Sequence, residues 1–218
     1  MKPSIQSQTD TTFIIIVAIS TVLLLIVTVL MIYFVIRYSK KRNPKPANIH
    51  GNTLLEVLWT VIPVILVLFI FFQSFSAFKY MRKAPADSME ITVTGQMWKW
   101  TFEYPNGKKT DTLYVPLYKP IKALIKSLDV NHSFYLPYFR VKEDAIPGRT
   151  NYLWFQPDRL GRFTITCAEY CGLEHAYMQT QVVVMPEDEF AEWYVKPQDS
   201  TAAPKDSINK NSADTFKK

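Results

Sequence analysis

The chain has 218 residues, enough for one modest domain with additional segments, and 48% of its residues are hydrophobic. Its formal net charge at pH 7 is +6, and it contains only two cysteines and three histidines. No Cys-x-x-Cys-His motif occurs, which excludes a covalently attached c-type haem. Much of the hydrophobic content lies in two blocks near the N-terminus.

The first block runs from Phe13 to Ile36 without a charged residue. A helix of about 24 residues crosses a hydrocarbon core of roughly 30 Å, so this block predicts a transmembrane helix. A cleavable signal peptide is the alternative, but its apolar region is only about 7–15 residues long and ends at a cleavage site. Here a basic run that begins at Arg37 follows instead.

The second block, Leu54 to Phe78, predicts a second transmembrane helix, which we expect Pro63 to kink. Glu56 departs from its apolar character. A carboxylate near the start of a membrane helix is costly unless it faces water, a partner or a proton path. Glu56 is therefore either an interfacial residue that reaches the membrane surface or part of such a path.

The distribution of positive charge predicts the orientation of this hairpin. Lysine and arginine are more frequent between the two blocks than in the segments that flank them, and the positive-inside rule then places the connecting loop on the cytoplasmic side. Both ends of the hairpin would face outward, together with the rest of the chain. His50 lies in the connecting loop, so the membrane would separate it from the other two histidines.

After the hairpin the pattern changes to short β-rich runs bounded by proline and glycine, which is typical of an all-β sandwich or barrel. We expect strands at residues 90–94, 97–104, 121–130, 152–156, 162–167 and 179–185. Within the second strand, Trp98 and Trp100 would share one face, either as core residues or as an exposed aromatic contact. The predicted organisation is residues 1–86 for the hairpin and its N-terminal segment, 87–196 for the β-domain, and 197–218 for a mobile tail.

One segment of the β-domain concentrates metal-binding side chains. Cys167, Cys171, His175 and Met178 lie close together between two predicted strands, and His132 follows an earlier strand. Thiolate, imidazole and thioether favour copper, zinc or iron–sulfur, and one thiolate with two imidazoles and an axial methionine is the ligand set of blue copper. The second thiolate exceeds what one copper needs. Two sulfurs that bridge a pair of copper ions are the sharper interpretation.

Three other interpretations are open. The spacing of the four residues would place them on one face of a buried helix, although Gly172 and the β-branched flanks argue against a continuous helix. Cys167 and Cys171 could form a disulfide in an oxidising compartment. Two thiolates and two imidazoles could hold structural zinc, but the usual paired spacings are absent and Met178 would then have no role.

Taken together, these motifs resemble subunit II of cytochrome c oxidase over about residues 13–196. The residues that carry the resemblance are Glu56-x-x-Trp59-Thr60, Trp98-x-Trp100, His132, Asp144-Ala-Ile-Pro147-Gly148-Arg149 and Cys167-x-Glu169-x-Cys171-x-x-x-His175-x-x-Met178. The resemblance implies a two-helix transmembrane hairpin followed by an all-β cupredoxin-like domain, which holds the dinuclear copper centre called CuA.

The resemblance also implies roles for individual residues. The copper ligands would be the bridging cysteines, two terminal imidazoles, a thioether and one backbone carbonyl, that is, Cys167, Cys171, His132, His175, Met178 and Glu169. The side chain of Glu169 would help to hold magnesium or manganese at the boundary with the catalytic subunit. Trp98 matches the aromatic residue through which electrons arrive from cytochrome c. Glu56 matches a carboxylate at the mouth of a proton-uptake path.

By the same resemblance, the chain is the electron-accepting subunit of a haem–copper oxidase in a bacterial or mitochondrial inner membrane, with the copper domain on the outer side. Its partners would be the catalytic subunit I and further subunits, the lipid bilayer, and cytochrome c or another haem c donor, with no nucleic acid. Three histidines are too few to hold the haems and copper that reduce oxygen. Oxygen reduction and proton pumping would therefore need the partner subunit. A non-copper quinol oxidase subunit or a copper-carrying assembly protein is the alternative.

Two residues depart from the family pattern Gly-x-Gln-Trp-aromatic-Trp, since Met97 replaces an amide and Lys99 replaces an aromatic residue. Acidic and basic residues nearly balance after the hairpin, so an acidic platform for a basic cytochrome c is not expected as a whole. Local acidic patches could still steer a donor, and Glu143, Asp144 and the cluster at residues 187–189 are the candidates.

Overall fold

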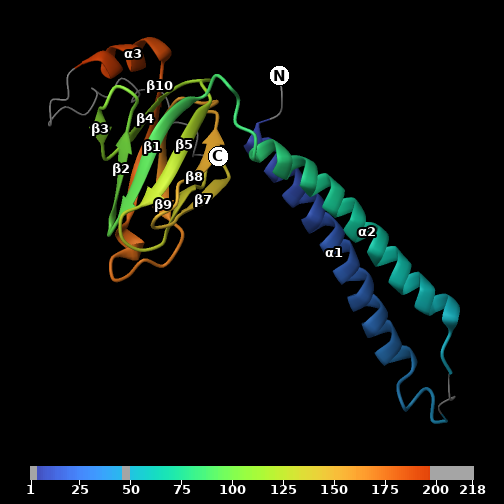
Figure 1. Ribbon diagram of the computed structural model, residues 1–218. Helices are drawn as coiled ribbons and strands as arrows, with labels where there is room; N and C mark the ends of the chain where they lie inside the picture. Colours follow the sequence, from blue (N-terminus) through green and yellow to red (C-terminus); the bar gives the residue numbers. More distant parts are fainter. Residues whose placement is uncertain (1–3, 46–49, 197–218) are drawn as a thin grey trace, which may run out of the picture. The chain divides into compact units, whose positions relative to one another are not determined.

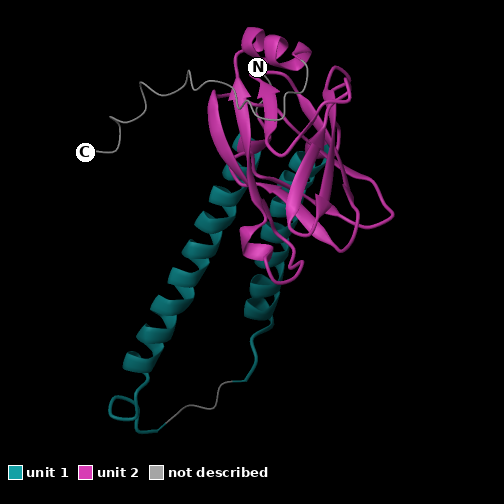
Figure 2. Cartoon of the chain, turned by 90° about the vertical axis from the view of Figure 1, so that its left-hand side faces the viewer, with its two compact units in different colours: residues 1, 7–79 teal, residues 2–6, 80–218 magenta. Residues whose placement is uncertain are grey.

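The computed structural model describes residues 4–45 and 50–196, and these residues form two compact units (Figures 1 and 2). Unit 1 is the helical part, residues 7–79, and unit 2 is the β-domain, residues 80–196 together with residues 4–6. The tail predicted at residues 197–218 lies outside the described residues. The domain boundaries predicted from the sequence stay predictions.

Two long helices, α1 (Ile5–Arg37) and α2 (Thr53–Met81), make up almost all of unit 1. Each is longer than the roughly 20 residues that a membrane crossing needs, and all of their apolar side chains except Ile5 are exposed or partly exposed. Asn52 caps α2, because its side-chain oxygen accepts hydrogen bonds from the backbone N–H groups of Leu54 and Leu55 at 3.0 and 3.2 Å. Pro63 lies inside α2, which continues past it.

Unit 2 is a sandwich of two five-stranded sheets, which confirms the predicted all-β domain (Figure 1). The strands are β1 (Met89–Gln96), β2 (Lys99–Glu103), β3 (Lys109–Thr110), β4 (Leu113–Pro116), β5 (Ile121–Ser127), β6 (His132–Leu136), β7 (Val141–Ala145), β8 (Asn151–Phe155), β9 (Gly161–Cys167) and β10 (Gln179–Met185). The first sheet has the order β3-β2-β1-β5-β8 and the second β4-β10-β9-β6-β7. Strand pairs β1–β5 and β4–β10 are parallel, and the other pairs are antiparallel.

The core lies between the sheets. In β5 every second side chain is buried, as the two-residue period of a strand requires when one face is covered. Phe134 of β6 meets Trp100 and Phe102 of β2 across the sandwich, with ring centroids 5.2 and 6.0 Å apart. Because such aromatic contacts join strands of different sheets, they hold the two layers in a defined register.

The structure corrects several predictions about individual elements. Trp98 does not lie on a strand, because β1 and β2 form a tight hairpin in which Gln96 pairs with Lys99 and Met97 and Trp98 make the turn. Trp98 and Trp100 therefore do not share a strand face. His132 is the first residue of β6 rather than a loop residue. Strands β3, β4, β6 and β7 were not predicted, and neither was a third helix, α3 (Glu187–Val195).

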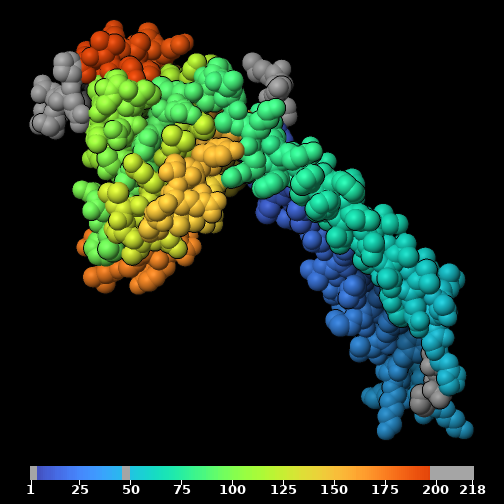
Figure 3. Space-filling model, viewed as in Figure 1, coloured from blue at the N-terminus to red at the C-terminus, as the bar shows by residue number. Residues whose placement is uncertain are grey.

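Helix α3 follows β10 and covers one end of the sandwich (Figure 3). Three acidic residues, 187–189, form its first turn, where they complement the positive end of the helix dipole. Lys108 anchors its other end by donating a hydrogen bond to the carbonyl of Trp193 and by lying over the Trp193 ring. Burial lowers the pKa of Lys108.

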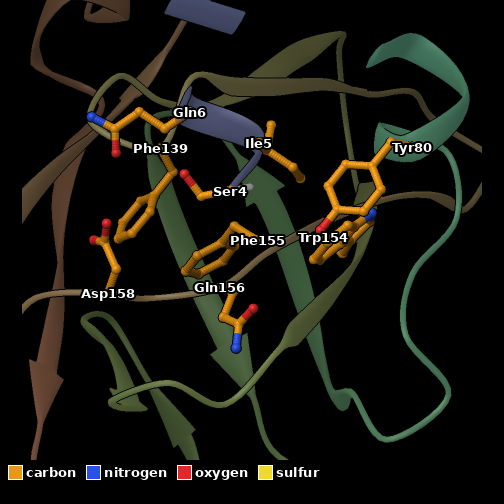
Figure 4. Close-up of a pocket in the computed structure, with 9 residues that line it drawn as sticks. All are labelled: Ser4, Ile5, Gln6, Tyr80, Phe139, Trp154, Phe155, Gln156 and Asp158. Carbon is orange, nitrogen blue, oxygen red and sulfur yellow. The ribbon is translucent and has the colours of Figure 1, made fainter. Parts of the chain in front are cut away.

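A small hollow opens in unit 2 at the end of the first sheet where β1 begins. Ile5 fills part of it and lies among Tyr80, Trp154 and Phe155 (Figure 4). Ile5 is 6% exposed, so the start of α1 contributes to the core of the β-domain. Residues 4–6 thus belong to this domain, at the end of the sheet remote from the cysteines.

Candidate metal centre

Two strands and the loop between β9 and β10 bring the predicted metal ligands together. Cys167 is the last residue of β9, and the chain then turns through a short 3₁₀-helix, His175–Tyr177, before β10 begins. His132 reaches the same place because β6 pairs with β9, with Phe134 opposite Cys167. Two backbone hydrogen bonds close the loop, from Cys167 N–H to Met178 O and from Ala168 N–H to Ser133 O. Figure 3 shows this loop at the end of the sandwich opposite α3.

The donor atoms converge on one small volume. The ligand atoms of His132, Cys167 and Cys171 lie within 4.8 Å of one another. The two sulfurs are 3.8 Å apart, Cys167 Sγ is 3.9 Å from His132 Nδ1, and Cys171 Sγ is 3.6 Å from His175 Nδ1. Met178 Sδ lies 3.8 Å from Cys171 Sγ. Each cysteine therefore has one imidazole beside it, with the sulfur pair in the middle.

This geometry excludes two of the alternative interpretations. The four residues of the loop do not form one helix, since only His175–Tyr177 is helical. The sulfurs are free thiols, and their separation of 3.8 Å is well beyond a disulfide bond of about 2.05 Å. The donor set of three sulfurs and two imidazoles suits a soft metal such as copper better than zinc, which has little affinity for a thioether.

The ligand cluster is shielded from water on most sides. His132 and Met178 are fully buried, while Cys167 and Cys171 are 8% and 5% exposed. Burial and the neighbouring Cys167 raise the pKa of the Cys171 thiol to about 11. Since metals bind the thiolate form, metal binding at Cys171 would release a proton.

Glu169 lies between the two cysteines in the sequence, and its backbone carbonyl and its side chain would have different roles. Its backbone carbonyl accepts a hydrogen bond from Cys167 Sγ at 3.2 Å and so belongs to the donor cluster. Glu169 as a whole is exposed to solvent. Among the described residues, one group of three or more metal-binding side chains lies close together, and it consists of His132, Cys167 and Cys171. The side chain of Glu169 belongs to no such group there.

Trp98 packs directly against the cysteine loop. Its indole N–H donates a hydrogen bond to the carbonyl of Cys171 at 3.2 Å, although 73 residues separate them. The ring also covers Gly172, where an added Cβ would lie 3.4 Å from Trp98 Cζ2. Trp98 is half-buried, so the residue contacts the ligand loop and is also partly exposed to solvent.

Asp129 is a site residue that the sequence analysis missed. Its Oδ1 lies 2.8 Å from His132 Nε2, and its Oδ2 accepts the Met97 N–H at 2.7 Å. Burial acts to raise the pKa of Asp129, but hydrogen bonds from Met97, His132 and Val130 outweigh it and lower the pKa to about 2. Its position three residues before His132 was the available signal, because metal-binding histidines usually have a carboxylate or carbonyl on their second nitrogen.

The remaining predicted residues are not among the donors of this cluster. Glu56 is in the first turn of α2 in unit 1 and is exposed. Among the acidic candidates, Glu143 pairs with Arg82 at 2.6 Å, and Asp144 accepts the hydroxyl of Ser133 at 2.7 Å. The acidic turn of α3 lies at the opposite end of β10 from the cysteine loop (Figure 1).

A β-sandwich with a cysteine- and histidine-rich loop at one end, preceded by two apolar helices, defines the class of membrane-anchored, cupredoxin-like proteins. The family profile for the transmembrane domain of cytochrome c oxidase subunit II matches residues 3–77, and that for its periplasmic domain matches residues 108–185. The chain belongs to the cytochrome c oxidase subunit II family. It is therefore a membrane protein whose β-domain corresponds to the periplasmic domain, and the family implies copper binding.

Named relatives and one solved domain are similar to this chain. Cytochrome c oxidase subunit 2 of Cereibacter sphaeroides is 31% identical over 204 residues, which cover 75% of this chain and 67% of that protein. The subunit 2 of Alkalihalophilus pseudofirmus is 34% identical over 177 residues, 76% of this chain and 52% of that protein. This chain thus spans about half to two thirds of their length. The periplasmic domain of subunit II from Bradyrhizobium japonicum is 36% identical, with a TM-score of 0.49, and covers 51% of this chain and 94% of that domain.

Proposed function

We propose that this chain is the electron-accepting subunit of a haem–copper oxidase and that its β-domain holds a dinuclear copper centre. The observation that carries the proposal is the convergence of two buried cysteine sulfurs, each with an imidazole of its own, in one cluster. The carbonyl of Glu169 lies on the Cys167 side and the thioether of Met178 on the Cys171 side. The donors thus divide into two similar halves around the sulfur pair.

The chain's own residues fit such a centre in three ways. When bound, a copper pair would supply a one-electron acceptor and donor. Cys167, Cys171, His132, His175, Met178 and the carbonyl of Glu169 would hold it. The β-sandwich keeps the histidine strand and the cysteine loop in register, so the ligands need move little when the charge of the site changes. Burial of His132 and Met178 excludes water from the inner side.

Trp98 is the proposed contact for electrons that arrive from a reduced haem c protein. The support is its position, since its indole touches the backbone of Cys171 while part of the residue remains exposed. Exposed apolar residues also occur next to it in the turn, Met97, and in two segments that contact the β1–β2 hairpin, Leu128 and Leu173.

The direct test is metal analysis and electron paramagnetic resonance of the purified full-length chain. We expect two coppers per chain and a spectrum in which one unpaired electron is shared by two copper nuclei. A single copper with a four-line spectrum would replace the proposal by a blue-copper site. Absence of any copper uptake under reducing conditions would favour the non-copper quinol oxidase subunit instead.

Glu56 is proposed to lie at the mouth of a proton-uptake path. The support is its place in the first turn of α2, where a carboxylate in an otherwise apolar helix needs a function to offset its cost. In the assembled oxidase, Glu56→Gln should slow proton-coupled turnover and leave the copper spectrum unchanged. Normal turnover would mean that Glu56 is an interfacial residue only.

The remaining parts of the proposal concern ions and partners outside the chain. The exposed side chain of Glu169 is proposed to bind magnesium or manganese together with groups of the catalytic subunit. Oxygen reduction and proton pumping would take place in that subunit, in a bacterial or mitochondrial inner membrane. Glu169→Gln should lower the content of bound magnesium or manganese in the oxidase and retain both coppers, because the copper contact is a backbone carbonyl.

A further inference from the structure

Gly95 occupies the next-to-last position of β1, beside two of the most buried residues of the site. It pairs with Trp100 on β2 and with Ser127 on β5. A Cβ added at Gly95 would lie 3.0 Å from Trp100 Cζ3, 3.1 Å from His132 Cδ2 and 3.4 Å from His132 Cγ. Contacts this short are rare for real Cβ atoms, so the neighbours would have to shift.

The backbone does not explain this glycine. Unlike Gly107, Gly148, Gly161 and Gly172, Gly95 is not among the described glycines with a positive φ. It lies in a regular strand whose conformation any residue adopts. The requirement for glycine is therefore one of space, and the rings of Trp100 and His132 fill that space.

The neighbours of Gly95 have little freedom to move. Trp100 is 2% exposed and is packed edge to face against Phe134 and against His132 itself, with centroids 5.2 and 6.0 Å away. His132 is fully buried, with Asp129 2.8 Å from one ring nitrogen and Cys167 Sγ 3.9 Å from the other. An added methyl group would thus press on a ring whose two nitrogens both have partners.

The hairpin that contains Gly95 also holds the residues that orient His132. The Gly95 carbonyl accepts the Leu128 N–H at 3.1 Å, and the Met97 N–H donates to Asp129. The turn that carries Asp129 is therefore tied to the β1–β2 hairpin at two points. Gly95 limits the position of the imidazole from one side, and Asp129 fixes its outer nitrogen.

We propose that Gly95 is a positioning residue for His132: the absence of a side chain at residue 95 sets where this imidazole lies relative to the two cysteine sulfurs. The inference rests on the proposed function in that His132 is taken as a ligand. The inference adds that Gly95, which has no side-chain donor atom and cannot bind metal through one, determines the position of one histidine ligand. Such an effect should appear at His132 and be absent at His175, which has no contact with Gly95 among those given by the structure.

Gly95→Ala in the full-length chain in detergent tests the proposal. In the copper-free protein, the ring resonances of His132, assigned by their loss in His132→Asn, should shift, while those of His175 stay in place. In the copper-loaded protein, two coppers should remain, and the nitrogen hyperfine coupling of one histidine should change together with the midpoint potential. Unchanged His132 resonances and an unchanged hyperfine pattern would overturn the proposal.

A matched control and a second variant keep the test decisive. Thr94→Ala alters the adjacent residue, whose side chain projects to the other face of the sheet, and should leave both histidines unperturbed. If Gly95→Ala fails to fold, Trp100→Phe is the second variant, because it makes the other ring beside Gly95 smaller and adds no atom. Its His132 signals should also shift, and parent-like signals would contradict the inference. Failure of the parent chain to bind two coppers would instead refute the proposed function, so the two failures are distinguishable.

Discussion

The membrane hairpin and the β-domain follow different physical rules. In α1 and α2 nearly every apolar side chain is exposed, because the surrounding lipid takes the place of a protein core and each helix satisfies its own backbone hydrogen bonds. In the β-domain most of the apolar side chains are buried between two sheets, and the strands depend on partners far away in the sequence. Composition therefore defines the first region, and long-range pairing defines the second.

The metal centre depends on long-range pairing of this kind. His132 and Cys167 are 35 residues apart in sequence, and Trp98 and Cys171 are 73 residues apart, yet each pair is in contact. These contacts exist only because β6 pairs with β9 and the β1–β2 turn reaches the cysteine loop. Substitutions in the β-domain should consequently act on the metal centre, on the Trp98 contact or on the stability of the domain, whereas those in the apolar parts of the hairpin should act on insertion and assembly.

The largest effect is expected for Cys167→Ser. A hydroxyl is a poor ligand for a soft metal, so loss of one of the two sulfurs should abolish the shared-electron spectrum completely. The measurement is electron paramagnetic resonance with copper analysis on the purified chain. Ala168→Ser, at the neighbouring exposed residue, is the control and should keep the signal. A shared-electron spectrum in Cys167→Ser would show that Cys167 is not a bridge.

A charge in the middle of α2 should come next. Leu68→Arg places a guanidinium among side chains that are exposed to lipid, which disfavours insertion by about 2.5–3.5 kcal/mol. The fraction of chain inserted into membrane vesicles measures this cost, and Leu68→Ile should insert normally. Equal insertion of both variants would mean that α2 is not a membrane span.

Trp98→Ala should slow electron transfer from a reduced cytochrome c without removing copper. Tryptophan anchors at interfaces typically contribute about 2 kcal/mol or more, so we expect a loss of roughly 30-fold in kcat/KM. Stopped-flow oxidation of the cytochrome measures it. Leu160→Ala removes another exposed apolar side chain before β9, at the end remote from Cys167, and should leave the rate unchanged. An unaltered rate in Trp98→Ala would move the contact elsewhere.

The smallest effect is expected at the other end of the sandwich. Lys108→Met removes the hydrogen bond to Trp193 and the cation–π contact that anchor α3, which should lower the free energy of unfolding by roughly 1–2 kcal/mol. Thermal unfolding of the full chain measures the loss, and Lys109→Met, at the adjacent exposed lysine, should change it less. Copper content and spectrum should be normal in both variants. A changed spectrum in Lys108→Met would show that the two ends of the domain are coupled.

The sequence by itself determined the two apolar helices, the change to β-structure after them, and the set of soft donors at residues 132, 167, 171, 175 and 178. Each of these follows from local composition or from short spacings, which do not depend on how the chain folds. The capping of α2 by Asn52 is likewise a local effect.

Only the tertiary structure decided which of these residues meet. In the structure Trp98 lies in a turn against Cys171 rather than on a strand face, and Asp129 lies beside the second nitrogen of His132. The rings of His132 and Trp100 leave no room for a side chain at Gly95. The tertiary structure also placed the acidic turn of α3 at the far end of β10. Contacts between segments far apart in the sequence set the positions of Trp98 and Gly95, and a hydrophobic or spacing pattern within one segment carries no information about the partner segment.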